Sequence, residues 1–307
     1  MYDLIIIGGG PAAAAAAVYA VGKQLHFLVI YAELGKAGRT QQLAGDSGAE
    51  FLAGADAVRM FERQVAQTNR TLCDYVTEVS QDSGLFRVAT KNHGTKSATA
   101  LIVATGATPI ALELPNANNL VGRGLGYSIT THAQLLDGKN TAVIGTTIRA
   151  LRGVAELSRN AAQVYLIAPD PARLSTPLAA ALEQRHNVEI LDGYTVEELV
   201  GAKNIEALVV ARNGQTRRLS VDAAFADLGL LPNSGTVRGL VQTDQDGFIW
   251  VDDRNATSTP GIFAAGDVTT SFGEQIMIAI GDGARAAISA YDYLLTIHPL
   301  APLGPVD

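Results

Sequence analysis

Short apolar runs alternate with helical segments along most of the chain. Leu4-Ile5-Ile6-Ile7, Leu25 to Ile30 and Leu101 to Val103 are rich in large aliphatic residues, many of them β-branched. Continuous runs of this length are typical of parallel strands buried on both faces of a sheet. The alanine-rich stretch Ala12 to Val21 predicts a buried helix between the first two runs. The start of the chain therefore predicts a strand, a helix and a second, parallel strand.

The same pattern begins again in the middle of the chain. Thr141 to Ile144 predicts a strand, about Ala150 to Ala162 a helix, and Val164 to Ile167 a parallel strand. Polar, proline-containing breaks flank this second unit at Leu112 to Asn119 and at Leu231 to Gly235.

The remaining segments return to the first unit. Phe248 to Val251 and Ile262 to Ala265 predict strands, and about Gln275 to Leu295 predicts a helix. We therefore expect an α/β protein with two Rossmann-like, three-layer dinucleotide-binding domains, the second inserted into the first. The predicted discontinuous first domain covers residues 1–116 and 246–307, and the predicted second domain covers 117–245.

Composition narrows the classes of partner. The 307 residues are 48% hydrophobic, which is enough for two medium cores, and carry a formal charge of -7. Negative charge disfavours nucleic acid and anionic membranes. Met1 leads directly into the first apolar run, and no apolar run approaches the roughly 18 residues that span a bilayer. These features predict a cytoplasmic protein without a membrane-spanning role.

The chain contains one cysteine, Cys73. A single cysteine excludes a Cys-x-x-Cys redox pair or a cysteine-based zinc cluster within these residues, and we predict no metal site. Because Thr71 to Val76 predicts a strand, we expect Cys73 to be a small buried apolar residue, the alternative being a reactive thiol.

A dinucleotide fingerprint follows the first predicted strand. Gly8 permits a tight turn, Gly10 lets a pyrophosphate approach the backbone, and Ala13 allows close packing of helix on strand. Pro11 suits the first helical turn, where Pro11, Ala12 and Ala13 form the amino-terminal end that attracts phosphate. Glu33 is a candidate partner for the ribose hydroxyls, and the alternative for Glu33 is a solvated loop position.

The second predicted strand-to-helix turn departs from this fingerprint. Gly145 is present, but Thr147 stands where the second glycine belongs. A threonine Cβ would point toward the path of the pyrophosphate. We therefore expect the first turn to hold a nucleotide and the second turn to have lost this capacity.

Further segments resemble the low-molecular-weight thioredoxin reductases, two-dinucleotide-binding flavoproteins. The resemblance covers nearly the whole chain and includes Ala104-Thr105-Gly106, Gly261 to Asp267 and Leu228 to Asn233. It implies that FAD is the cofactor, that the Ala104-Thr105-Gly106 and Gly266-Asp267 segments lie at FAD, and that Asp267 holds a ribityl hydroxyl. It also implies that Gln275 and Ile276 lie under the isoalloxazine at a helix N-terminus.

The chain differs from this family at the redox pair. The resemblance places Ser128 and Thr131 where the family has its two cysteines. Hydroxyl groups cannot perform thiol–disulfide exchange, so these residues exclude an internal dithiol relay for this chain acting alone. His132 follows, where the family has an acidic proton donor, and could move a proton, the alternative being a solvent-facing histidine. Tyr127 could stack near the ring, the alternative being a space-filling role.

The nicotinamide nucleotide site of the family is also altered. Where the family has a histidine and arginines for the 2′-phosphate of NADPH, this chain keeps Arg173 and adds Asp170. We therefore expect an FAD-dependent oxidoreductase that exchanges electrons directly at the flavin, without NADPH. The candidate donors or acceptors are ferredoxin, another flavoprotein, a quinone, oxygen or a small molecule.

Two alternatives remain open. One is an NAD(P)H-dependent flavin reductase with a remodelled central site. The other is a flavin-binding redox sensor without enzymatic activity. The resemblance also implies a homodimer.

Overall fold

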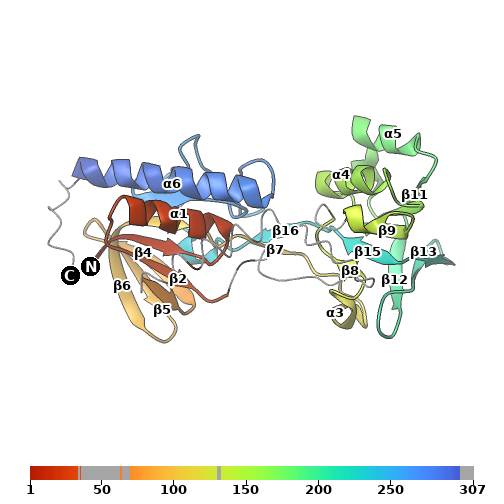
Figure 1. The fold of residues 1–307 in the computed structure, drawn as a ribbon, viewed down its shortest axis with the longest axis horizontal. Coiled ribbons are helices and arrows are strands. Elements are labelled where there is room, and N and C mark those ends of the chain that lie inside the picture. The colour runs from red at the N-terminus through yellow and green to blue at the C-terminus, as the bar shows by residue number, and fades with distance from the viewer. Residues whose placement is uncertain (34, 36–62, 64–69, 130–132, 298–307) are drawn as a thin grey trace. The chain divides into compact units, whose positions relative to one another are not determined.

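The computed structural model describes residues 1–33, 35, 63, 70–129 and 133–297. They form two units, each an α/β structure (Figure 1). One unit runs from Pro109 to Leu230, and the other comprises described residues up to Thr108 and from Leu231 onward. This arrangement confirms the predicted α/β class with the second unit inserted into the first. No helix among the described residues is long and apolar enough to cross a membrane.

The first unit is built on a parallel sheet with the order β3-β2-β1-β6. Strand β17 pairs with the carboxyl-terminal half of β6, on the edge of β6 opposite to β1. These strands span Thr71–Cys73 (β3), Phe27–Tyr31 (β2), Tyr2–Ile7 (β1), Gly94–Val103 (β6) and Ile262–Ala264 (β17). Helices α1 (Pro11–Gly22) and α6 (Ile276–Ile297) lie side by side against this sheet (Figure 1).

An antiparallel extension widens the sheet, and the sequence pattern did not predict it. Strands β4 (Val76–Asp82) and β5 (Leu85–Thr90) form a hairpin, and β5 pairs with the first half of β6. Ser83 and Gly84 have φ angles of 52° and 83° at the turn, as a tight two-residue hairpin loop requires. Strand β6 therefore belongs to the hairpin at its start and to the parallel sheet at its end.

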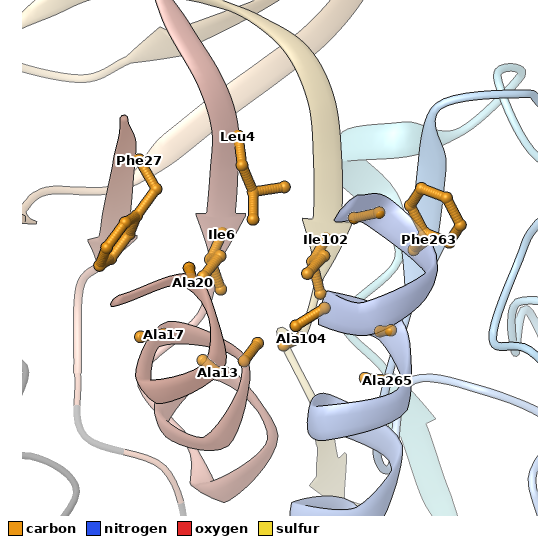
Figure 2. Close-up of a cluster of buried hydrophobic side chains, with 14 of the residues drawn as sticks. Leu4, Ile6, Ala13, Ala17, Ala20, Phe27, Ile102, Ala104, Phe263 and Ala265 are labelled. Atoms are coloured by element: carbon orange, nitrogen blue, oxygen red, sulfur yellow. The ribbon is translucent and has the colours of Figure 1, made fainter. Parts of the chain in front are cut away.

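Small residues let the two helices approach the sheet and each other. Figure 2 shows Ala13, Ala17 and Ala20 of α1 in the same buried cluster as Ile6 and Phe27. The backbones of the two helices also meet, because a Cβ on Gly283 of α6 would lie 2.0 Å from the carbonyl oxygen of Ala12. This contact fixes α1 against α6 beside the carboxyl ends of the strands.

The second unit has its own parallel sheet, with the order β11-β10-β9-β15-β8. Its strands span Val188–Asp192, Gln163–Ala168, Asn140–Ile144, Ala223–Ala226 and Leu125–Gly126, in that order. The helices of this unit are α3 (Ala117–Leu120), α4 (Ile148–Leu157) and α5 (Pro177–Glu183). An antiparallel meander completes the unit, with strands β12 (Thr195–Val200), β13 (Ala207–Arg212) and β14 (Gln215–Ser220).

The chain passes twice between the units, and the two passages are hydrogen-bonded to each other. Strand β7 (Ala107–Pro109) pairs with β16 (Leu230–Pro232). Short 3-10 turns at Ala133–Leu136, Pro171–Leu174 and Gly235–Val237 complete the secondary structure of the described residues.

Two local predictions were wrong. Phe248 to Val251 does not form a strand, since Ile249 makes only isolated bridges to Thr243 and Thr269. Cys73 is exposed rather than buried. It is the last residue of β3, which among the described strands pairs only with β2 and so forms an edge of the sheet.

Candidate functional site

The strand register brings the predicted nucleotide-binding segments to one edge of the first sheet. Ile7 pairs with Ile30 on one side and with Val103 on the other, and Val103 pairs with Ala264. The residues that follow these four strand positions therefore lie in one row. Ligands of open α/β sheets bind in this position, outside the carboxyl ends of the strands.

Gly8 joins two of these segments. Its N–H donates to the carbonyl of Ile30 at 2.8 Å, and its φ is 135°. A Cβ at this position would lie 2.1 Å from the carbonyl oxygen of Ala104. Only glycine fits, so the turn after β1 and the segment after β6 form a single structure.

Gly10 leaves open space at the N-terminus of α1. It is the N-cap residue, without a side chain that could bond the first turn, and Pro11 begins the helix. Among the described residues, a Cβ on Gly10 would meet only the Cα of Gly35, at 3.9 Å. The first N–H groups of a helix have no partner inside the helix, so this end favours an anion. Ala12 and Ala13 of this first turn are buried against the core.

Glu33 lies beside this turn, with an exposed side chain. Its backbone carbonyl approaches the turn, because a Cβ on Gly9 would lie 2.3 Å from that oxygen.

Asn233 holds the Ala104-Thr105-Gly106 segment, an arrangement that the sequence did not predict. Its Nδ2 donates to the Thr105 carbonyl at 2.9 Å, and its backbone N–H donates to the Gly106 carbonyl at 2.9 Å. The Thr105 hydroxyl donates back to the Asn233 carbonyl at 2.7 Å. The Thr105 side chain is therefore engaged by the protein, while a Cβ on Gly106 would meet no atom within 4 Å.

A buried carboxylate lies behind the Gly266-Asp267 turn. Asp282 of α6 is 4% exposed, and its Oδ2 accepts the Gly266 N–H at 3.4 Å. Burial raises the pKa of the Asp282 carboxyl, while the Gly266 N–H and the Arg285 guanidinium, 3.6 Å away, act in the opposite direction. Asp267 itself is half-buried at the end of the turn.

The N-terminus of α6 carries the last two predicted cofactor residues. Helix α6 begins at Ile276, which is half-buried, and the carbonyl of the exposed Gln275 accepts the N–H of Ala279 at 3.0 Å. Gln275 is therefore the residue that caps the helix with its backbone. A positive helix end thus lies at this position, as it does at α1.

The second strand-to-helix turn is closed by the protein's own side chains. Thr147 is the N-cap of α4, and its hydroxyl accepts the Ala150 N–H at 2.9 Å. The same hydroxyl donates to Asp227 Oδ1 at 2.9 Å. Unlike Gly10, Thr147 therefore occupies its helix N-terminus with a side chain.

Asp227 is the residue that sequence reasoning missed at this turn. It follows Ala226, which pairs with Ile144, so it lies in the same row as Gly145. Arg149 donates to both of its oxygens, from Nε at 2.7 Å and from a terminal nitrogen at 2.6 Å. The Asp227 side chain is 5% exposed and that of Arg149 is 24% exposed. The available signal was a carboxylate immediately after a buried strand.

The predicted phosphate-binding arginine is also paired with a carboxylate. Arg173 Nε lies 3.3 Å from Asp170 Oδ2, and both side chains are more than half exposed. Asp170 also caps its own turn by accepting the Ala172 N–H at 3.2 Å.

The predicted catalytic positions lie in the second unit or outside the described residues. The Tyr127 hydroxyl accepts the Leu112 N–H at 3.3 Å, within the second unit. Ser128 is exposed, and Thr131 and His132 lie outside the described residues. No group of three or more His, Cys, Asp or Glu side chains suited to a metal ion occurs in the part of the chain that the structure describes.

Comparisons with known proteins agree with this geometry. The family model of the pyridine nucleotide-disulphide oxidoreductases matches residues 2–283. The F subunit of alkyl hydroperoxide reductase from Xanthomonas campestris pv. phaseoli is 31% identical over 304 residues, which cover 96% of this chain and 57% of that protein. The corresponding protein from Staphylococcus aureus (strain MRSA252) is 28% identical, with 96% of this chain and 59% of that protein covered. The chain thus spans less than two thirds of the length of these relatives.

Two solved structures share the fold. Thioredoxin reductase from Streptococcus pyogenes MGAS5005 gives a TM-score of 0.83 at 26% identity, covering 97% of this chain and 99% of that chain. Thioredoxin reductase from Giardia duodenalis gives a TM-score of 0.82 at 24% identity, covering 96% of this chain and 99% of that chain. At this identity the likeness concerns the fold alone. The predicted resemblance is confirmed at the level of family and fold.

Proposed function

The chain belongs to the pyridine nucleotide-disulphide oxidoreductase family, and on this basis we propose that it binds FAD in its first unit and exchanges electrons directly at the flavin. The family match confirms the predicted oxidoreductase class. The specific features proposed for this chain are the absence of an internal dithiol relay and of NADPH as the electron donor.

A single contrast between the two turns supports this proposal. At Gly10 the helix N-terminus has no side-chain cap, and a Cβ would meet only one atom of the described residues within 4 Å. At Thr147 the corresponding helix N-terminus is capped, and the buried Asp227 with its partner Arg149 lies beside it. The first turn can receive a pyrophosphate, whereas the second is filled by groups of the protein.

The residues of the first unit fit FAD. Gly8, Gly10 and the first turn of α1, with Pro11, Ala12 and Ala13, would hold the pyrophosphate, and Glu33 the adenosine ribose. Ala104-Thr105-Gly106 and Gly266-Asp267 would line the path of the ribityl chain. Gln275 and Ile276 would direct the N-terminus of α6 toward the isoalloxazine, where the helix dipole favours negative charge. When bound, FAD supplies the capacity to take up and release electrons.

The sequence supports the absence of a dithiol relay. These 307 residues contain one cysteine, Cys73, and Ser128 stands at a position where the family resemblance implies a thiol. A hydroxyl provides neither a thiolate nor a disulfide. Reduction of a protein disulfide or a peroxide, which the names of the relatives suggest, would need cysteines from another chain or segment.

The proposed electron partner is a protein or small molecule that reaches the flavin directly. The candidates are ferredoxin, a second flavoprotein, a quinone, oxygen or another small molecule. His132 is proposed to move a proton, and Tyr127 is proposed to stack near the ring. We also propose that the protein is a homodimer. We further propose that the discontinuous unit, predicted as residues 1–116 and 246–307, is the FAD-binding domain, and that the inserted unit, predicted as 117–245 and observed as Pro109–Leu230, is the degenerate nucleotide domain.

Anaerobic titration of the FAD-loaded protein tests this function. Flavin absorbance is followed during separate additions of NADPH, NADH and reduced ferredoxin, with dithionite as the positive control. We expect bleaching with dithionite and with ferredoxin, and none with either nicotinamide at micromolar concentration.

Each other outcome selects an alternative. Rapid bleaching by NADPH or NADH would favour the NAD(P)H-dependent flavin reductase, which the family match itself makes the second candidate. Protein that is purified without FAD and cannot be reconstituted would contradict the proposal altogether. A flavin that no external reductant reaches would favour the sensor.

A further inference from the structure

Two arginines that follow strands β9 and β10 are held by carboxylates of the same unit. Arg149 is bonded to Asp227, and Arg173 is paired with Asp170. The Arg149 pair is the stronger feature, because it is bidentate and the carboxylate is buried. Arginine presents its planar fork to phosphate and to carboxylate in the same way. A carboxylate in this position therefore satisfies the contact that a phosphate oxygen would make.

The Asp227 carboxylate also contacts the other phosphate-binding element of the turn. It accepts the hydroxyl of Thr147, whose oxygen in turn accepts the Ala150 N–H of the first turn of α4. A cation and a hydroxyl thus bond one buried negative charge, and the hydroxyl links that charge to the helix N-terminus. These are the groups that bind a pyrophosphate in an intact turn of this kind.

We propose that Asp227 is an internal anion that takes the place of a nucleotide phosphate and so determines which nucleotides this protein accepts. The inference rests on the proposed function, and it adds a cause for the loss of nicotinamide use. Closure of the second turn is due to the charge of Asp227 more than to the missing glycine at Thr147.

Electrostatics make the carboxylate an effective barrier. An entering phosphate would meet a negative charge that is shielded from water, and like charges in contact repel strongly under such conditions. To bind Arg149, the phosphate would also have to displace Asp227 and leave its buried carboxylate without that cation. A threonine Cβ, in contrast, obstructs the path without adding any charge.

The test compares single variants of the FAD-loaded protein. Asp227→Ala removes the carboxylate, and Asp227→Asn removes the charge while keeping the volume. Thr147→Gly restores the glycine and keeps the carboxylate. Asp222→Ala is the matched control, because Asp222 precedes β15 whereas Asp227 follows it. Asp222 also pairs with a lysine, Lys139, at 3.8 Å, but both of these side chains are exposed.

Isothermal titration calorimetry with ADP as the probe measures binding to each variant, while flavin absorbance verifies that FAD stays bound. We expect Asp227→Ala and Asp227→Asn to bind ADP about tenfold or more tightly than the wild-type protein does. Asp222→Ala should behave as the wild type. Circular dichroism verifies the fold, and if Asp227→Ala does not fold, the comparison rests on Asp227→Asn.

Two results would overturn the inference. One is wild-type affinity for ADP in both Asp227 variants. The other is a gain in Thr147→Gly that exceeds the gain in the Asp227 variants, since this would make the missing glycine the main obstacle. Both readouts are independent of electron transfer, so a wild-type flavin that NADPH reduces would reject the proposed function without deciding this comparison.

Discussion

Gly8 and Ala104 approach so closely that a Cβ on the first residue would lie 2.1 Å from the carbonyl oxygen of the second. The two residues follow strands β1 and β6, and both belong to segments that we assign to FAD. Because the obstacle is backbone, it cannot rotate away. The proposed FAD site, which Gly8 and Ala104 help to form, is therefore sensitive to a single added methyl group.

We expect Gly8→Ala to lower FAD retention severely and to destabilise the fold by about 1–3 kcal/mol. The ratio of flavin to protein absorbance and the thermal unfolding temperature measure the two effects. Gly84→Ala is the control, because Gly84 also has a positive φ, 83°, but a Cβ there meets nothing within 4 Å. An equal fall in unfolding temperature in both variants would show that strain at φ, rather than the contact with Ala104, causes the destabilisation.

Asn233 is expected to stabilise the segment after β6. Asn233→Ala removes the bond to the Thr105 carbonyl and the bond that Thr108 donates to Asn233 Oδ1 at 3.1 Å. Each such bond contributes about 0.5–1.5 kcal/mol net, so we expect a loss of about 1–3 kcal/mol and weaker FAD binding. Thr108→Val should show about half of the stability loss. Chemical denaturation measures the stability loss, and FAD titration of the apoprotein measures the binding. Unchanged FAD affinity would contradict a role for the hydrogen bonds of Asn233 in FAD binding.

Asp282 is expected to make the folded state less stable as the pH rises. Burial raises the pKa of its carboxyl, so the folded state binds this proton more tightly than the unfolded chain does. The resulting stabilisation is complete below the ordinary pKa of 3.8 and is lost as the pH rises through the folded pKa. Asp282→Asn should therefore gain in unfolding temperature over the wild type as the pH rises above about 4. A difference that is constant with pH would contradict this.

Asp74 is expected to act in the opposite direction. Burial alone would raise the pKa of its carboxyl, but hydrogen bonds from His93, Asn92 and Tyr75 hold that pKa well below its ordinary value of 3.8. Its stabilisation is therefore present above the ordinary pKa and is lost as the pH falls.

Asp74→Asn should be less stable than the wild type at about pH 7, and the difference should shrink as the pH falls below about 4. The free energy of unfolding in urea at several pH values measures this. Asp82→Asn is the control in the same hairpin, because Asp82 forms an exposed pair with Arg87 at 3.0 Å, and such pairs contribute about 0–1 kcal/mol. An equal pH response in both variants would contradict the assignment to Asp74.

The parts of the fold that depend on local pattern could be predicted from the sequence. The strand that ends at Ile7, the turn at Gly8 and the helix that begins at Pro11 all follow from neighbouring residues. The strand predicted at Phe248 to Val251 was wrong because an apolar run does not reveal whether a partner strand is available. The predicted burial of Cys73 was wrong for a related reason, since burial at the edge of a sheet depends on distant elements.

The candidate site could be predicted only in part, for the same physical reason. The sequence shows that Thr147 stands in place of a glycine. The hydrogen bond from the Thr147 hydroxyl to Asp227, however, joins residues 80 positions apart. Likewise, Asn233 bonds to Thr105 across 128 positions. Such partners are set by strand order, which local periodicity does not encode.

The contact between Ala12 and Gly283 has a consequence for the order in which the protein forms during its synthesis. Helix α6 is translated after the whole of the second unit, so α1 leaves the ribosome long before the helix that covers it. The segment from Pro109 to Leu230 is continuous and can fold while translation proceeds. The turn of Gly8 and Gly10 is therefore synthesised before the second unit but gains its contact with α6 only after it, and nascent chains that stop before Gly283 lack that contact.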